Sequence, residues 1–195
     1  MEHIAAQETR TTEPQWAFAP CLCVARDDRW GRTYESFGET PSLVREMETA
    51  IDGFQGPPGD LSHPDRVLAT AKHFAGDGLT TYGTGSNLQT TGNYPIDQGV
   101  DLVNHAKFRR LALSPYVPAV RKHHVGAVMP SYSDVDWTED GLGNRINMHG
   151  NRGAAAPVAS DGAAAPVAIK RTTPGRRIFS RCLSIPPLSL TLVSV

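Results

Sequence analysis

Hydrophobic residues between positions 42 and 55 recur at the spacing of one face of a helix. The residues on that face are Leu43, Met47, Ala50, Ile51 and Phe54. Ser42 is the expected N-cap, and the Gly-Pro-Pro-Gly sequence at 56–59 contains the residues that usually end a helix. The pattern therefore predicts an amphipathic helix over residues 42–55.

Short apolar runs that are typical of buried strands occur three times along the chain. They cover residues 15–24, 66–71 and 125–129. The helix predicted over 42–55 separates the first two runs, and a helical pattern from Asp101 to Arg121 precedes the third. That second pattern is interrupted by Pro115 and Pro118. Strands that alternate with helices indicate βαβ units, so the sequence predicts an α/β fold with a parallel sheet.

The composition changes in the last quarter of the chain. The net charge is −6 over residues 1–150 and +5 over the remainder, with histidines counted as neutral. The heptapeptide Gly-Ala-Ala-Ala-Pro-Val-Ala occurs twice between residues 153 and 168, and no helical or alternating period follows it. We predict one domain over residues 1–152 and a low-complexity, disordered tail over 153–195 without a packed core. A linker to a further domain is the alternative.

Charge and hydropathy exclude two classes of protein. Nineteen Lys and Arg residues against 20 Asp and Glu residues leave a net charge of −1. This balance argues against a nucleic-acid binder that depends on phosphate contacts. No stretch reaches the roughly 18 apolar residues that a membrane span needs, so no membrane partner is expected. Residues 1–10 lack the apolar region of a secretory signal, and we predict no particular cellular compartment from the sequence.

The cysteines favour a structural interpretation. Cys21, Cys23 and Cys182 are too few for a disulfide framework, and Cys21 and Cys23 have no second pair to complete a zinc site. We therefore expect Cys21 and Cys23 to be small buried hydrophobic residues, and we expect no metal and no cofactor.

Polar side chains follow each predicted strand. They lie in residues 26–39, 72–78 and 131–133, and they include Arg32, Lys72, His73 and Tyr132. Because the carboxyl ends of parallel strands meet at one edge of a sheet, these side chains are expected to converge there. Such directed donors suit a polyhydroxylated ligand, although a phosphate or a carboxylate would also be satisfied by them.

Four sequence blocks carry a family resemblance. They are R-D-D-R-W-G-R-T-Y-E-S at 26–36, A-K-H-F-A-G-D-G at 71–78, V-M-P-S-Y-S at 128–133 and N-M-H-G-N-R at 147–152. In this order and at this spacing, they resemble the blocks of glycoside hydrolase family 3, the β-glucosidase-like enzymes. The similarity runs from about Gln15 to Arg152. It implies a TIM-type (β/α) barrel domain, of which this chain would contain about three strands.

The resemblance also implies a subsite for a β-glucoside or oligosaccharide. Arg32, Lys72 and His73 would bind ring hydroxyls, and Tyr132 would lie near the reacting carbon with Met129 beside it. Each residue has a structural alternative. Arg32 could form an ion pair with Glu35 or Asp28, and Lys72-His73 could be a solvated strand end. Tyr132 and Met129 could belong to the core.

The family's chemistry is retaining hydrolysis by two carboxyl groups about 5–5.5 Å apart. Its nucleophilic aspartate follows another apolar strand, roughly two dozen residues beyond the block that ends at Arg152. The Ala- and Pro-rich sequence there provides no such strand, so we reject Asp161 and assign no catalytic residue. A changed reading frame near residue 152 is one hypothesis for the shift. The resemblance predicts a β-glucosidase-type hydrolase; the alternative is a truncated, inactive fragment that binds carbohydrate weakly.

Two structural expectations follow. Lys72 and His73 are neighbours, and neighbouring side chains on a regular strand point to opposite faces. If both contact one sugar, the chain must leave regular strand geometry at residues 72–74. A partial parallel sheet also has open edges, which favour non-specific self-association.

Overall fold

The computed structural model describes residues 1–86, 94–151, 154 and 191–192. The helices are α1 (Glu2–Thr11), α2 (Pro41–Glu46), α3 (Thr49–Gln55), α5 (His105–Phe108), the π-helical η2 (Arg109–Leu113) and α6 (Tyr116–Arg121), with 3-10 turns η1 (Thr33–Glu35) and η3 (Met148–Gly150). The strands are β1 (Thr70–Phe74), β2 (Val100–Leu102), β3 (Ala127–Pro130), β4 (Asp134–Asp136), β5 (Arg145–Asn147) and β6 (Thr191–Leu192). Most of the predicted tail, residues 153–195, lies outside the described residues.

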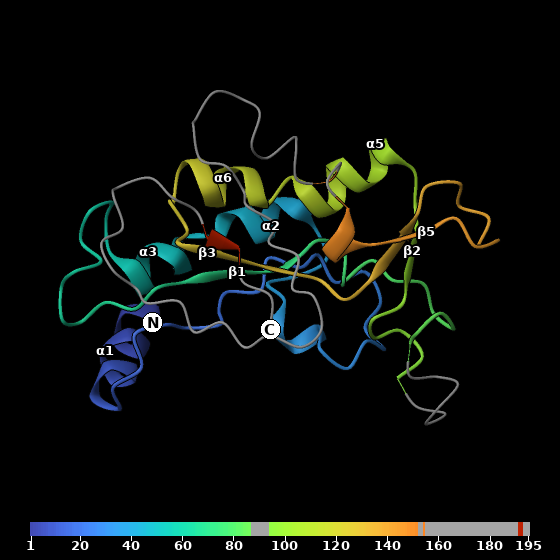
Figure 1. The fold of residues 1–195 in the computed structure, drawn as a ribbon. Helices are drawn as coiled ribbons and strands as arrows, with labels where there is room; N and C mark the ends of the chain where they lie inside the picture. The colour runs from blue at the N-terminus through green and yellow to red at the C-terminus, as the bar shows by residue number, and fades with distance from the viewer. Residues whose placement is uncertain (87–93, 152–153, 155–190, 193–195) are drawn as a thin grey trace, which may run out of the picture.

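The strands form two small sheets with helices beside them (Figure 1). The first sheet has the order β1-β3-β6, and both of its pairings are parallel. The second has the order β2-β4-β5, in which β2 and β4 are parallel and β4 and β5 are antiparallel. The α/β class and the parallel pairing of the second and third predicted strands are confirmed. Among the described residues, no helix is long and apolar enough to span a membrane.

The first predicted strand, residues 15–24, is an extended segment and not a continuous strand. It runs parallel to β1 and pairs through isolated bridges at Trp16 and Cys21. The Ala17 amide donates to the Leu68 carbonyl at 2.8 Å, and the Leu22 amide donates to the Lys72 carbonyl at 2.7 Å. Pro20 has no amide hydrogen to donate, which limits the ladder in the middle of this segment.

The helix predicted over residues 42–55 is divided into α2 and α3. Its N-cap is Thr40, whose Oγ1 accepts from the Leu43 amide at 3.5 Å, and not Ser42 as predicted. The break leaves Leu43 and Met47 exposed, while the later apolar positions are buried. Gly56 ends α3 with φ 71°, so the predicted end is correct.

The helical pattern from Asp101 to Arg121 is only partly helical. Asp101 lies in β2, and the helix begins after Asn104, whose Oδ1 accepts from the Lys107 amide at 3.0 Å. Pro115 is the N-cap of α6, as expected of a residue that interrupts one helix and permits the next.

Strand β1 begins later than the predicted run at 66–71, and it contains the expected irregularity. The Lys72–His73 peptide bond is cis. Ala71 pairs with Val128 and Phe74 pairs with Pro130, so the register shifts between these two points. This register shift confirms the predicted departure from regular strand geometry at residues 72–74.

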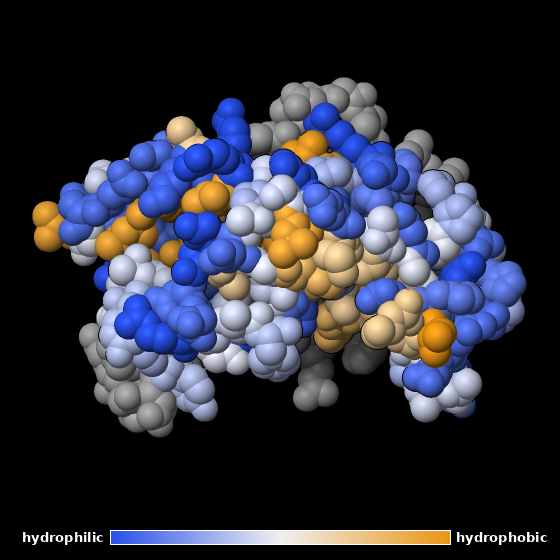
Figure 2. Space-filling model, turned by 180° about the vertical axis from the view of Figure 1, so that it is seen from behind, coloured by the Kyte–Doolittle hydropathy of each residue, from blue (hydrophilic) through white to orange (hydrophobic). Residues whose placement is uncertain are grey.

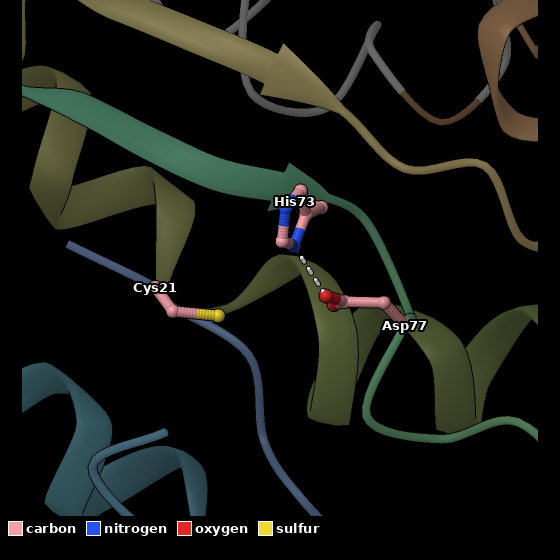
Figure 3. A group of neighbouring side chains, drawn as sticks. All are labelled: Cys21, His73 and Asp77. Atoms are coloured by element: carbon pink, nitrogen blue, oxygen red, sulfur yellow. Dashed lines mark hydrogen bonds and ion pairs between the residues drawn. The ribbon is translucent and has the colours of Figure 1, made fainter. Parts of the chain in front are cut away.

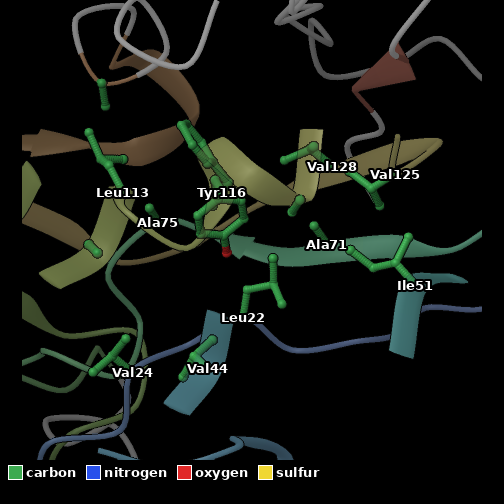
Figure 4. Close-up of a cluster of buried hydrophobic side chains, with 14 of the residues drawn as sticks. Leu22, Val24, Val44, Ile51, Ala71, Ala75, Leu113, Tyr116, Val125 and Val128 are labelled. Carbon is green, nitrogen blue, oxygen red and sulfur yellow. The ribbon is translucent and has the colours of Figure 1, made fainter. Parts of the chain in front are cut away.

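The main hydrophobic core lies between β1, β3 and the helices beside them (Figure 4). Leu22, Ile51 and Tyr116 are among its largest fully buried side chains. The Phe74 and Tyr116 rings meet edge to face with centroids 4.9 Å apart. These contacts fix the carboxyl end of β1, where the candidate site begins.

A smaller core cluster contains Cys21, Cys23 and Trp30. Both cysteines are buried, as predicted, but their sulfur atoms are bonded at 2.04 Å. The expectation that they are separate hydrophobic residues is wrong, because the extended segment directs both side chains to the same side.

Gln55 joins α3 to the amino ends of β1 and β3. Its Oε1 accepts from the amides of Ala69 at 3.0 Å and Gly126 at 2.8 Å, and its Nε2 donates to the His124 carbonyl at 3.0 Å. One buried side chain thus satisfies three backbone groups where the two strands begin.

Candidate functional site

Glu35 is the centre of a cluster at the carboxyl end of β1. Arg32 donates to its carboxylate through Nε at 2.7 Å and Nη2 at 3.1 Å. The Lys72 ammonium lies 2.8 Å from Glu35 Oε2. These contacts, the Arg32 hydrogen bonds first, lower the pKa of Glu35 to about 2. The carboxylate therefore stays ionised and holds both cations in place.

His73 extends this cluster toward Asp77. Its Nδ1 lies 2.6 Å from Asp77 Oδ2, and its Nε2 lies 3.1 Å from Arg32 Nη2. A guanidinium can only donate, so Nε2 accepts and Nδ1 carries the proton that is donated to Asp77. This network requires the neutral imidazole, buried to 8% exposure.

Three of the five predicted sugar-binding residues therefore meet: Arg32, Lys72 and His73. The alternative pairing of Arg32 with Glu35 is present at the same time. A solvated strand end does not describe the other two, because the Lys72 side chain is 15% exposed and His73 is buried.

Met129 lies in the neighbouring strand β3, and Tyr132 lies just after that strand. Met129 is half-buried, and Tyr132 has 52% of its surface exposed. The Tyr132 ring stacks on His149 at a centroid distance of 4.8 Å, and its carbonyl accepts from Asn147 Nδ2 at 3.2 Å. Tyr132 is therefore not a core aromatic residue.

A pocket of about 240 Å³ borders the cluster. Glu2, Glu35 and Lys72 are the charged residues of its wall. The rest of the wall is formed by Phe18, Ala19, Pro20, Cys21, Phe37, Ala50 and Phe54. Glu35 and Lys72 thus lie beside space that a small molecule can enter.

The sequence pattern did not identify Asp77 and Asp101 as residues of this site. Asp101 is fully buried in β2, and neither of its carboxylate oxygens has a hydrogen-bond partner. Burial raises the pKa of Asp101 well above its usual range, and Asp77 and Asp134 raise it further. Asp101 packs on Gly76, whose φ of 106° turns the chain after β1. Asp77 lies in the A-K-H-F-A-G-D-G block at 71–78, but the helical pattern around Asp101 did not indicate a buried carboxyl.

Within the part of the chain that the structure describes, one group of side chains could hold a metal ion. Cys21, His73 and Asp77 each place a potential ligand atom within 4.8 Å of those of the other two. Figure 3 shows the Cys21 sulfur directed toward the His73–Asp77 pair. In this structure the same sulfur is bonded to Cys23.

Comparison with known proteins gives one family. The profile described as the glycosyl hydrolase family 3 N-terminal domain matches residues 1–154. A β-xylosidase of Formosa agariphila is 35% identical over 131 residues, which are 66% of this chain and 16% of that protein. A β-glucosidase B of Emericella nidulans is 29% identical over 134 residues, 68% of this chain and 13% of that protein. This chain therefore spans less than a fifth of the length of these relatives.

Solved structures agree with this similarity. The exo-1,3/1,4-β-glucanase of a Pseudoalteromonas species superposes with a TM-score of 0.62 at 33% identity, over 76% of this chain and 16% of that chain. A β-glucosidase from Listeria innocua in complex with glucose has a TM-score of 0.58 at 28% identity, over 69% of this chain and 17% of that chain.

Proposed function

The chain belongs to glycosyl hydrolase family 3, and from this membership we propose that residues 15–152 are part of a β-glycosidase. The extended segment 15–24, β1 and β3 would be three adjacent strands of a TIM-type (β/α) barrel. Relatives named as β-glucosidases and β-xylosidases support a substrate with a terminal β-D-glucosyl or β-D-xylosyl unit. The retaining mechanism is the one that the family resemblance implies.

The observation that carries the proposal is the charge balance of the site. Arg32 and Lys72 pair with the Glu35 carboxylate, and His73 accepts from Arg32 and donates to the Asp77 carboxylate. Glu35 and Asp77 would repel a phosphate or a carboxylate that approached the cations. A neutral sugar avoids this cost and uses both the donors and the acceptors. The balance therefore favours a sugar over an anion.

Each residue has a role in this proposal. Arg32, Lys72 and His73 hydrogen-bond the hydroxyls of one sugar ring and fix its orientation. Tyr132 lies beside the reacting carbon, and Met129 supplies an apolar wall. Their positions at the ends of β1 and β3 support a shared subsite, since Phe74 pairs with Pro130.

Retaining hydrolysis needs a carboxylate that attacks the anomeric carbon and an acid that protonates the departing oxygen. We assign neither role within this chain, because Glu35 and Asp77 are engaged in ion pairs and hydrogen bonds. The 195 residues alone would bind the sugar without cleaving it. By itself, the chain would therefore be the inactive, weakly carbohydrate-binding fragment that the sequence offered as the alternative.

Glucose titration tests the subsite. Chemical shifts of the chain are expected to respond with a Kd in the millimolar range or weaker, about 4 kcal/mol or less of binding free energy. Arg32→Ala and Lys72→Ala should each weaken binding by about tenfold, because each removes a charged donor. Arg66→Ala is the matched control, since Arg66 also pairs with a carboxylate, Asp60 Oδ2 at 3.0 Å, but outside this cluster.

Two results would contradict the proposal. One is the absence of any glucose-dependent shift at concentrations well above the millimolar range. The other is equal affinity in the wild type, Arg32→Ala and Lys72→Ala, with all three folded by circular dichroism.

A further inference from the structure

We propose that reduction of the Cys21–Cys23 disulfide creates a zinc site from Cys21, Cys23, His73 and Asp77. Along the chain, Cys21 and Cys23 are a Cys-X-Cys pair without a second pair of ligands. The fold supplies that second pair from the end of β1, with ligand atoms of Cys21, His73 and Asp77 within 4.8 Å of one another (Figure 3). The inference does not depend on the proposed glycosidase function.

The chemistry of these groups fits zinc. Structural zinc sites are tetrahedral and combine cysteine, histidine and carboxylate ligands. Cys23 is bonded to Cys21, so its sulfur lies next to the same cluster and can serve as the fourth ligand after reduction. All four residues are buried except for small fractions of their surface, which excludes most competing water.

A second observation points to a missing ligand. Asp77 is 7% exposed, and its Oδ1 is buried without a hydrogen-bond partner, although Oδ2 is bonded to His73. An unpaired buried carboxylate oxygen is costly. A cation between Asp77, His73 and the two sulfurs would satisfy it.

The reaction balances with a dithiol as reductant. The dithiol gives two electrons and two protons to the Cys21–Cys23 bond and becomes a disulfide itself. Zn²⁺ then binds as both protein thiols release their protons. Where zinc takes the position of the Nδ1 proton of His73, the ring proton lies on Nε2. Nε2 then no longer accepts from Arg32, whose two bonds to Glu35 remain.

Cobalt and zinc titrations of the whole chain test the site. The Cys182→Ser background removes the third thiol, and a phosphine reduces the disulfide without competing for metal. The phosphorus of the phosphine takes the oxygen of a water molecule, and the two protons of that water go to the Cys21 and Cys23 sulfurs. The reduced protein should bind one Co²⁺ with thiolate charge-transfer and tetrahedral absorption bands, and Zn²⁺ should displace it. The oxidised protein should show neither band.

Variants identify the ligands. Cys21→Ser and Asp77→Asn should each weaken Zn²⁺ binding by about 100-fold in competition with a chromophoric chelator. Asp65→Asn is the matched control and should bind as the parent does. Absence of the thiolate band in the reduced parent would overturn the proposal without any need for a variant. Unchanged affinity in Cys21→Ser or in Asp77→Asn would also overturn it.

Discussion

At the scale of single residues, Glu35 determines how the cations of the site are held. Its carboxylate accepts from Arg32 and Lys72, and its pKa of about 2 keeps it ionised in any neutral or mildly acidic solution. The donors are therefore fixed before a ligand arrives. Less side-chain conformational entropy is then lost when the ligand binds. A sugar has to fit this arrangement, and its hydroxyls replace water on donors that are already oriented.

A different carboxyl, Glu48, should make stability depend on pH. Glu48 is fully buried between α2 and α3, neither of its oxygens has a hydrogen-bond partner, and burial raises its pKa from 4.5 to about 8. Between these values the folded state binds more protons than the unfolded state, so stability falls as pH rises from 4.5 to 8. The slope contributed by one such group approaches about 1.4 kcal/mol per pH unit. Urea denaturation at pH 5 and pH 8 measures it.

Glu48→Gln removes this titration and should flatten the pH dependence of the unfolding free energy. Glu46→Gln is the matched control, because Glu46 is exposed on α2 and should leave the slope unchanged. An equal fall in stability between pH 5 and pH 8 in Glu48→Gln and the wild type would contradict the assignment of the slope to Glu48.

The cationic residues of the site could be predicted from the sequence, but the Cys21–Cys23 bond and the burial of Asp101 beside them could not. Arg32, Lys72 and His73 stand in recognisable blocks directly after apolar runs, so their convergence could be predicted from chain order. The bond between Cys21 and Cys23 could not, because it depends on the side to which the extended segment turns both sulfurs. The burial of Asp101 was equally hidden, since a strand of three residues, β2, is too short to produce an alternating pattern.

At the scale of elements, the order of strands could be predicted but their ends could not. The apolar run at 66–71 placed the second strand, yet β1 continues to Phe74 because backbone pairing with β3 sets its limits. The continuous helical period over 42–55 concealed a break at Met47 and Glu48, where α2 ends and α3 begins. Tertiary packing determined these boundaries, and it leaves no local signal in the sequence.

Gln55 should be essential for the junction of α3 with the sheet. Gln55→Leu keeps the volume but leaves the Ala69 and Gly126 amides and the His124 carbonyl without their partner. The bond to the Ala69 amide is fully buried, and an unpaired buried group costs about 1–3 kcal/mol, while the two part-buried bonds add less. We therefore expect a loss of about 2 kcal/mol or more in unfolding free energy. Urea denaturation of the purified variants measures this loss.

Gln7→Leu provides the comparison. Gln7 makes one part-buried hydrogen bond, its Nε2 donating to Asp65 Oδ2 at 3.2 Å, so its loss should cost about 1 kcal/mol or less. Equal effects of Gln55→Leu and Gln7→Leu would show that the three bonds of Gln55 do not stabilise the junction.

At the scale of the whole molecule, we expect self-association. Within the described residues, neither three-stranded sheet closes on itself, and Phe18, Leu43 and Met47 are 50%, 42% and 41% exposed. Figure 2 shows hydrophobic surface between hydrophilic regions on one face. Open strand edges and exposed apolar side chains both favour association. Sedimentation velocity over a hundredfold dilution should give a concentration-dependent mass. A monomer at every concentration would exclude self-association.

The separation of binding from hydrolysis is also a property of the whole chain. Incubation with aryl β-glucosides and aryl β-xylosides should release no aryl alcohol above the buffer rate, because no nucleophile and no acid/base are assigned in it. Asp161→Asn should make no difference. If the wild type hydrolysed an aryl glycoside and Asp161→Asn abolished this activity, Asp161 would be a catalytic residue. The chain would then not be an inactive fragment.

The hydrogen bonds of Gln55 also bear on the order in which a growing chain can fold. A ribosome makes the chain from its N-terminus, so Ala69 emerges soon after Gln55, whereas His124 and Gly126 emerge much later. Until then the amide group of Gln55 has one backbone partner of three, and β1 has no β3 beside it. Residues 1–86 therefore emerge from the ribosome with one edge of β1 unpaired, and this edge favours association with other chains until β3 has been made.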